Sequence, residues 1–144
     1  MILTLTSETF SEESDGRFLS EGETRTVLPC RFLSKKSGSY SISYDEKSAE
    51  SHASTRMAYD IESRTLTLSR LGDVRYTAVF GAEPCQFVYS VPPFSFDATA
   101  ETESLTSSVT ASGGTLVLSY LLTLNDVRRR VCLTAVLDEK EAKA

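Results

Sequence analysis

The sequence has little of what catalytic and metal sites are built from. Its 144 residues include one histidine and three cysteines, Cys30, Cys85 and Cys132, which lie far apart and form no CxxC pair. Zinc sites draw on closely spaced Cys and His ligands, so this spacing does not indicate zinc. The odd number of scattered cysteines favours reduced thiols in a cytoplasmic protein. We therefore expect no metal and no cofactor.

Long hydrophobic runs and basic clusters are also absent. No stretch approaches the ~20 apolar residues of a membrane-spanning helix, and the first ten residues, MILTLTSETF, lack the charge and the apolar run of a signal peptide. The net charge is −5, and the only basic run is Arg128, Arg129 and Arg130. Nucleic acids and anionic membranes need clustered positive charge, so we expect neither as a partner. The run itself is typical of a solvated strand start or turn.

Catalytic patterns are missing as well. His52 lies in the segment AESHAS, where we expect an exposed loop, so no base is placed beside a serine or cysteine nucleophile. Asp45 and Glu46 are adjacent, and neighbouring residues of a strand point to opposite faces, which prevents the two carboxylates from flanking one bond. Glycine-rich phosphate loops are not found. We predict that the protein is not an enzyme.

What the sequence does contain is alternation of apolar and polar residues, which is typical of strands with one buried face. Turn residues such as Gly113-Gly114 and Asn125-Asp126 separate these segments, and no stretch keeps a helical period. The pattern predicts an all-β fold, an antiparallel up-and-down meander of about eight to ten strands closed or nearly closed into a barrel. A two-sheet sandwich is the alternative. We expect one domain over residues 1–137 and a charged tail, 138–144.

The clearest hairpin is RTLTLSRLGDVRYTAVF, residues 64–80. Apolar residues recur at every second position on both sides of its glycine, so a shared face requires a loop with an odd number of residues. A three-residue loop from Leu71 to Asp73 meets this condition and pairs Leu68 with Tyr76. Arg70 then falls on the apolar face, which is an unexpected position for a charge.

All six tyrosines lie on the apolar parity of their strands, and so do Glu46, Arg70 and Thr102. Buried phenols need hydrogen-bond partners, and a guanidinium suits a carboxylate or phosphate. These groups either satisfy one another in a filled core or line a pocket near Ala98 and Ala100 for a small polar or anionic ligand. The predicted ligand-binding residues are Tyr40, Tyr44, Glu46, Tyr59, Arg70, Tyr76, Tyr89, Thr102 and Tyr120.

Several short motifs occur in a fixed order along most of the chain. They are ISYDE (42–46), a strand beginning at Thr55, LSRLGDV (68–74), Phe80, Thr102 and GGTLVLSYLL (113–122). In this order they resemble the YwiB-like family of uncharacterised bacterial proteins. The resemblance implies a calycin-like or lipocalin-like β-barrel and implies no chemistry. The chain departs from the family pattern at Cys30-Arg31, in place of a Thr-Gly step, and at Pro93-Phe94, in place of a glycine turn.

The sequence thus favours non-enzymatic binding of a small polar or amphipathic ligand inside the barrel. The alternative is a protein-interaction or structural module with a filled core. Either function is compatible with a monomer or a homodimer.

Overall fold

The structure is a computed structural model that describes residues 1–47 and 52–139. In this part of the chain it contains eleven strands and no helix, so no helix there could cross a membrane. The predicted all-β class is confirmed, and residues 140–144 of the predicted tail lie outside the described residues. The strands are β1 (Ile2–Glu12), β2 (Phe18–Pro29), β3 (Arg31–Ser34), β4 (Tyr40–Lys47), β5 (His52–Asp60), β6 (Thr65–Leu71), β7 (Tyr76–Phe80), β8 (Cys85–Val91), β9 (Phe94–Ser107), β10 (Gly114–Leu124) and β11 (Val127–Asp138).

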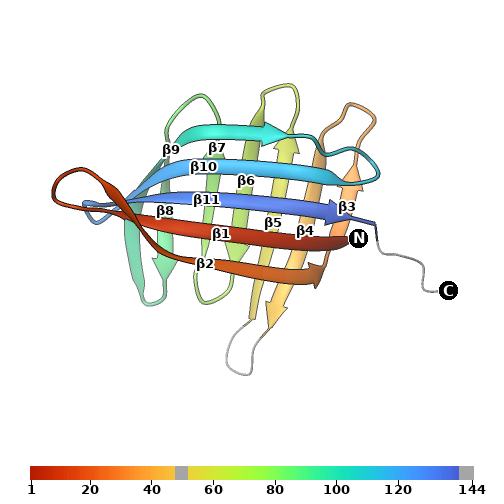
Figure 1. The fold of residues 1–144 in the computed structure, drawn as a ribbon. Coiled ribbons are helices and arrows are strands. Elements are labelled where there is room, and N and C mark those ends of the chain that lie inside the picture. Colours follow the sequence, from red (N-terminus) through yellow and green to blue (C-terminus); the bar gives the residue numbers. More distant parts are fainter. Residues whose placement is uncertain (48–51, 140–144) are drawn as a thin grey trace.

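The strands form two antiparallel sheets that pack face to face. One sheet has the order β2-β1-β11-β10-β9-β8 and the other β3-β4-β5-β6-β7. Strands β1, β2, β10 and β11 run across the strands of the sheet behind them, as in orthogonally packed sheets, whereas β8 runs alongside β7 in the rear layer (Figure 1). Because the hydrogen bonds make two sheets and no single closed cylinder, the closed barrel is not confirmed. The two-sheet alternative describes the observed hydrogen bonding.

The chain passes from one sheet to the other through a single residue. β2 ends at Pro29 and β3 begins at Arg31, so Cys30 alone forms the corner, and its amide donates to the carbonyl of Met1 at 3.1 Å. Proline has no amide hydrogen to give to a ladder, which suits the end of a strand. The corner is therefore encoded locally, at Pro29.

On the opposite side, β7 and β8 join the sheets along a seam of a few hydrogen bonds. The links are the backbone groups of Arg75 and Ser90 (2.8 and 2.9 Å), the Val79 amide with Cys85 Sγ (3.3 Å), and the Gly81 amide with Thr102 Oγ1 (3.0 Å). Side chains of β8 and β9 thus accept the amide of Val79 on β7 and the amide of Gly81 just after it. The β7–β8 seam brings the two sheets close to closure without a continuous ladder.

The hairpin of residues 64–80 differs from its prediction in register. Tyr76 pairs with Arg70, and Leu68 pairs with Ala78 instead of with Tyr76. The loop is longer than three residues because the Arg75 backbone bonds to Ser90 of the other sheet instead of to β6. The loop length remains odd, so the apolar rows still share one face, as predicted.

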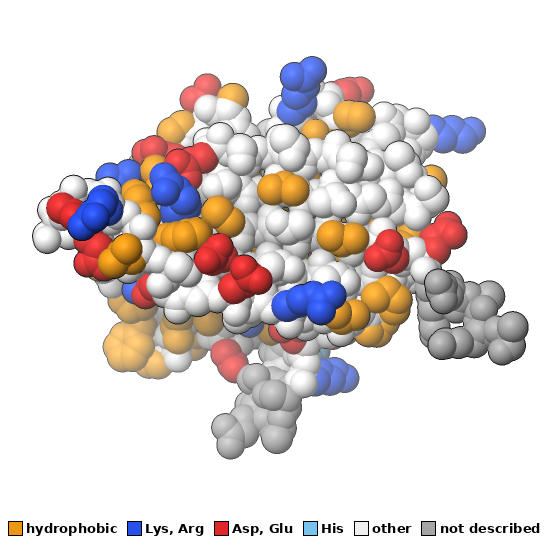
Figure 2. Space-filling view, in the orientation of Figure 1, with side chains coloured by type: hydrophobic (Ala, Val, Ile, Leu, Met, Phe, Trp, Pro, Cys, Tyr) orange, Lys and Arg blue, Asp and Glu red, His pale blue; other side chains and the backbone are white. Residues whose placement is uncertain are grey.

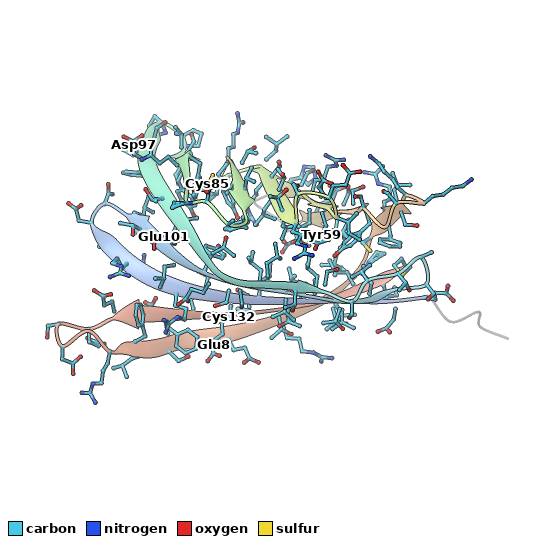
Figure 3. The ribbon with its side chains drawn as sticks, turned by 90° about the horizontal axis from the view of Figure 1, so that it is seen from above. Glu8, Tyr59, Cys85, Asp97, Glu101 and Cys132 are labelled. Carbon is cyan, nitrogen blue, oxygen red and sulfur yellow. The ribbon has the colours of Figure 1, made fainter. Side chains whose placement is uncertain are left out.

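The core lies where the inner faces of the two sheets are closest. Its fully buried side chains come from both sheets: Leu3, Ile42, Met57, Leu66, Phe80, Leu116, Leu118 and Leu137. Seen from above, the two layers lie near each other where β2 runs into β3 and separate toward the opposite side (Figure 3). The two layers are therefore farther apart toward the seam than at the corner.

Removing the hydroxyl of Thr102 should loosen the β7–β8 seam. Thr102→Val keeps the shape but leaves the Gly81 amide without its acceptor, and we expect a loss of about 1 kcal/mol in the free energy of unfolding, measured by urea denaturation. Thr99→Val on the same strand is the matched control, expected to lie within about 0.5 kcal/mol of wild type. Equal effects of the two variants would contradict this role of Thr102.

Candidate functional site

A polar row crosses the inner face of the five-stranded sheet, beyond its apolar rows. Cross-strand pairing places Tyr44, Thr55, Arg70 and Tyr76 side by side on four neighbouring strands, β4 to β7. Glu46 lies next to this row, two residues after Tyr44 on β4. By contrast, the preceding row, Ile42, Met57, Leu68 and Ala78, is apolar and buried. We call Tyr44, Thr55, Arg70 and Tyr76 the polar row.

Two hollows lie between the sheets and meet at the polar row. The first, the aromatic hollow, has a volume of about 250 Å³ and is lined by Arg70, Val74, Tyr76, Phe80, Phe87, Tyr89, Tyr120 and Leu122. The second, the hydroxyl hollow, has a volume of about 280 Å³ and is lined by Leu5, Ser7, Thr24, Thr26, Tyr44, Glu46, Thr55, Leu68, Arg70, Tyr76, Tyr120, Val131 and Leu133. Arg70, Tyr76 and Tyr120 line both, so these three side chains stand at the junction.

Among residues 1–47 and 52–139, Arg70 is the only positive charge that lines either hollow. Its Nη1 lies 3.9 Å from Glu46 Oε1, which is too long for a hydrogen bond, and the two side chains are 33% and 41% exposed. Arg70 Nε and Thr55 Oγ1 are buried without a hydrogen-bond partner among the residues that the structure describes. A buried donor or acceptor without a partner costs stability, so both groups are available to a ligand.

The phenols around Arg70 stay protonated at neutral pH. Burial raises the pKa of Tyr44 to about 12, and burial also raises the pKa of Tyr76 and of Tyr120. A neutral phenol can donate a hydrogen bond to an anion or accept one from a cation. The tyrosines of the walls therefore add no negative charge beside Arg70, and the negative group there is the Glu46 carboxylate.

Aromatic contacts fix the walls of the aromatic hollow. The ring centroids of Tyr76 and Tyr89 are 5.6 Å apart in a stacked arrangement, and those of Tyr76 and Phe87 are 5.8 Å apart. Phe80 packs on Tyr120 with centroids 4.5 Å apart. Offset and tilted pairs at these distances are favourable, so the rings hold their positions. The hollow has a firm apolar wall on the side away from Glu46.

Three predicted ligand residues lie elsewhere. Tyr40 stacks on Tyr59 with centroids 5.4 Å apart, and its hydroxyl is 2.7 Å from Ser107 Oγ in the other sheet. Thr102 accepts the Gly81 amide in the β7–β8 seam. Tyr40 and Thr102 connect the sheets, Tyr59 packs on Tyr40, and none of the three lines either hollow. The other six, Tyr44, Glu46, Arg70, Tyr76, Tyr89 and Tyr120, come together around the polar row.

Neither hollow at the polar row is lined by Ala98 or Ala100, near which the sequence predicts the pocket. Both alanines are buried, and their larger partners on the neighbouring strands, Phe87 opposite Ala98 and Leu122 opposite Ala100, line the aromatic hollow instead. A separate hollow of about 800 Å³ over β8, β9 and the end of β10 does reach Ala98, but its described lining residues include Asp97 and Asp126 and no lysine or arginine.

Some lining residues were not predicted. Thr24, Thr26 and Ser7 line the hydroxyl hollow from β2 and β1, and Phe87 lines the aromatic hollow from β8. Thr24 and Thr26 continue the inward parity of Leu28, so a signal existed in the sequence. This signal was weak, because threonine is common in strands on either face and its presence does not mark an inward position.

His52 begins β5 and is exposed, so the expected loop is wrong, although the exposure is as predicted. Its Nε2 lies 4.0 Å from Asp45 Oδ1, which accepts a hydrogen bond from the Ser54 hydroxyl at 2.7 Å. That hydrogen bond lowers the pKa of Asp45. Because the serine donates to the aspartate and not to the histidine, the arrangement supplies no base to a nucleophile. Over residues 1–47 and 52–139 no group of His, Cys, Asp and Glu could hold a metal ion.

The arginine run lies at the start of β11, as the sequence predicts. Each guanidinium meets a carboxylate of another strand: Arg128 with Glu12 (3.2 Å), Arg129 with Glu21 (3.1 Å) and Arg130 with Glu103 (2.7 Å). Arg130 also lies 4.3 Å above the ring of Phe18. These three charges are neutralised within the chain, and unlike Arg70 none of them lines either hollow.

Alkaline pH should destabilise the protein through its buried tyrosines. A phenol whose pKa rises from 10.0 to about 12 on folding, as for Tyr44, contributes stability below pH 10 that is lost as the pH rises toward 12. We expect the free energy of unfolding to fall by up to about 1 kcal/mol per pH unit for each such group. Tyr120→Phe removes one of these groups, so its decline should be shallower. Denaturation at stepped pH measures this, and equal slopes would contradict it.

Comparisons with known proteins agree with the fold and supply no activity. YwiB from Bacillus subtilis has a similar crystal structure, with a TM-score of 0.70 and 18% sequence identity over 96% of this chain and 92% of that chain. At this identity the similarity concerns the fold alone. No curated protein matches the chain significantly. Residues 6–132 match the family described as a domain of unknown function (DUF1934). The resemblance seen in the sequence is thereby confirmed, and the chain belongs to the DUF1934 family.

Proposed function

We propose that this domain binds a small organic anion between its two sheets and performs no chemistry on it. One observation carries the proposal: Arg70 stands where two hollows meet, with a buried Nε that has no partner in the described part of the chain. A guanidinium in such surroundings is suited to a carboxylate or phosphate, because its planar fork can donate two parallel hydrogen bonds. We propose that the ligand lies in the interior of the domain, as ligands do in calycin-like proteins.

The walls of the hollows favour an organic ligand over a bare inorganic ion. The side chains of Phe87, Tyr89 and Leu122 offer apolar surface within the aromatic hollow. The combination of a largely apolar pocket and a few converging polar groups is typical of small-molecule sites. The two volumes, about 250 and 280 Å³, suit a compact molecule and not a long lipid chain.

The alternative, an interaction module with a filled core, has less support. A filled core would leave no hollows at the polar row. Figure 2 shows the outer face of the front layer, where the apolar side chains are interspersed with charged side chains and white surface. A docking site on this face would instead carry one contiguous apolar patch. The thiols of Cys30, Cys85 and Cys132 are all free, which supports a reducing, cytoplasmic location within the proposal.

Binding should depend on negative charge and on Arg70. Titration calorimetry with phenyl phosphate, benzoate and the neutral benzyl alcohol should give measurable binding of the two anions only. Arg70→Met should weaken binding at least about tenfold, since charge-assisted hydrogen bonds are worth about 1.5–3 kcal/mol. Arg56→Met, an exposed arginine on β5, is the matched control and should bind as wild type does. Native mass spectrometry of protein from its own host should reveal a co-purifying anion.

Two results would count against the proposal. Benzyl alcohol binding as tightly as benzoate would remove the role of charge. Unchanged affinity in Arg70→Met, with the fold intact by circular dichroism, would place any anion site away from the polar row.

A further inference from the structure

We infer that the ligand is a zwitterion of the amino-acid class, with an ammonium group beside its carboxylate and an apolar or aromatic side chain. This inference rests on the proposed function and makes it narrower. It begins from Glu46, whose carboxylate faces the same hollow as Arg70, 3.9 Å from its Nη1. The two groups are close enough to attract each other but form no hydrogen bond.

A ligand that carries only negative charge fits this pair poorly. An anion at Arg70 comes within a few ångströms of the Glu46 carboxylate, and like charges at that distance repel. A ligand with an ammonium group next to its carboxylate places one charge on each partner. The spacing of opposite charges in the protein then matches the spacing of opposite charges in the ligand.

The surroundings of Glu46 also suit an ammonium group. An ammonium has three hydrogens to donate, and the hydroxyl hollow presents three oxygens from neighbouring positions: the Glu46 carboxylate, Thr55 Oγ1 and the Tyr44 hydroxyl. Thr55 is only 6% exposed, and its Oγ1 has no partner in the described chain. Tyr44 pairs with Thr55 across β4 and β5, so the register of the sheet places these two residues side by side.

The aromatic hollow then receives the ligand's side chain. It begins at the same Arg70, Tyr76 and Tyr120 that close the hydroxyl hollow, and it extends away from Glu46 toward Phe87 and Tyr89. A side chain that enters it leaves the charged end at the polar row. The order along the site is thus ammonium at Glu46, carboxylate at Arg70, and apolar group against the aromatic rings.

Three probes that differ by one charged group test the inference: phenylalanine, 3-phenylpropionate, which lacks the ammonium, and phenethylamine, which lacks the carboxylate. Calorimetry on the wild-type protein should show phenylalanine binding at least about tenfold more tightly than either analogue. In Glu46→Gln this advantage over 3-phenylpropionate should disappear. Asp45→Asn, the adjacent residue on the outward face of β4, is the matched control and should keep the wild-type ranking.

The outcomes separate this inference from the proposed function. If 3-phenylpropionate binds wild type as tightly as phenylalanine, or if Glu46→Gln tightens every anion and preserves their ranking, Glu46 competes with the ligand, and the zwitterion inference is wrong while the anion site stands. If neither these probes nor phenyl phosphate and benzoate bind, both proposals are wrong. Circular dichroism of each variant confirms that a lost signal reflects binding and not unfolding.

Discussion

The structure depends on how two crossed sheets are held together at their sides. At the corner a single residue, Cys30, carries the chain from one sheet to the other, and this fixes the layers close together. At the opposite side the β7–β8 seam joins the sheets through a backbone pair and two side-chain acceptors. Twisted sheets that meet at a corner diverge away from it, and here the layers separate toward the side where Phe87 and Tyr89 of β8 line the aromatic hollow.

The polar row occupies the border between filled and open space. One row nearer the centre of the sheet, Met57 and Leu68 are packed from both layers and exclude water. At the polar row, Arg70 can keep its charge because its head is one third exposed, while its Nε remains buried. Local rules of strand patterning put apolar residues at such inward positions, and departures from those rules occur most often at functional sites.

Much of this arrangement follows from the sequence, because side-chain parity is a local property of a strand. Parity places Tyr44, Arg70 and Tyr76 on the inner face correctly. Parity does not say which part of the interior a residue reaches. Tyr40 and Tyr44 have the same parity, but the Tyr40 hydroxyl contacts Ser107 whereas Tyr44 lines the hydroxyl hollow. The hairpin register and the division into two sheets depend on contacts distant in sequence, above all Arg75 with Ser90, and alternation carries no signal for these.

Stability alone does not account for Arg70 and Glu46. Ion pairs that are this exposed contribute about 0–1 kcal/mol, and this one lacks the hydrogen bond that would fix its geometry. An apolar residue at position 70 would pack against Leu68 and Tyr76 with no buried donor left over. By comparison, Arg130 of β11 forms two hydrogen bonds with Glu103 of β9, at 2.7 and 3.0 Å, across the intervening strand β10. The chain can build a tight arginine–carboxylate pair, and at the polar row it holds the two charges apart with open space beside them, which suits a ligand that inserts between them.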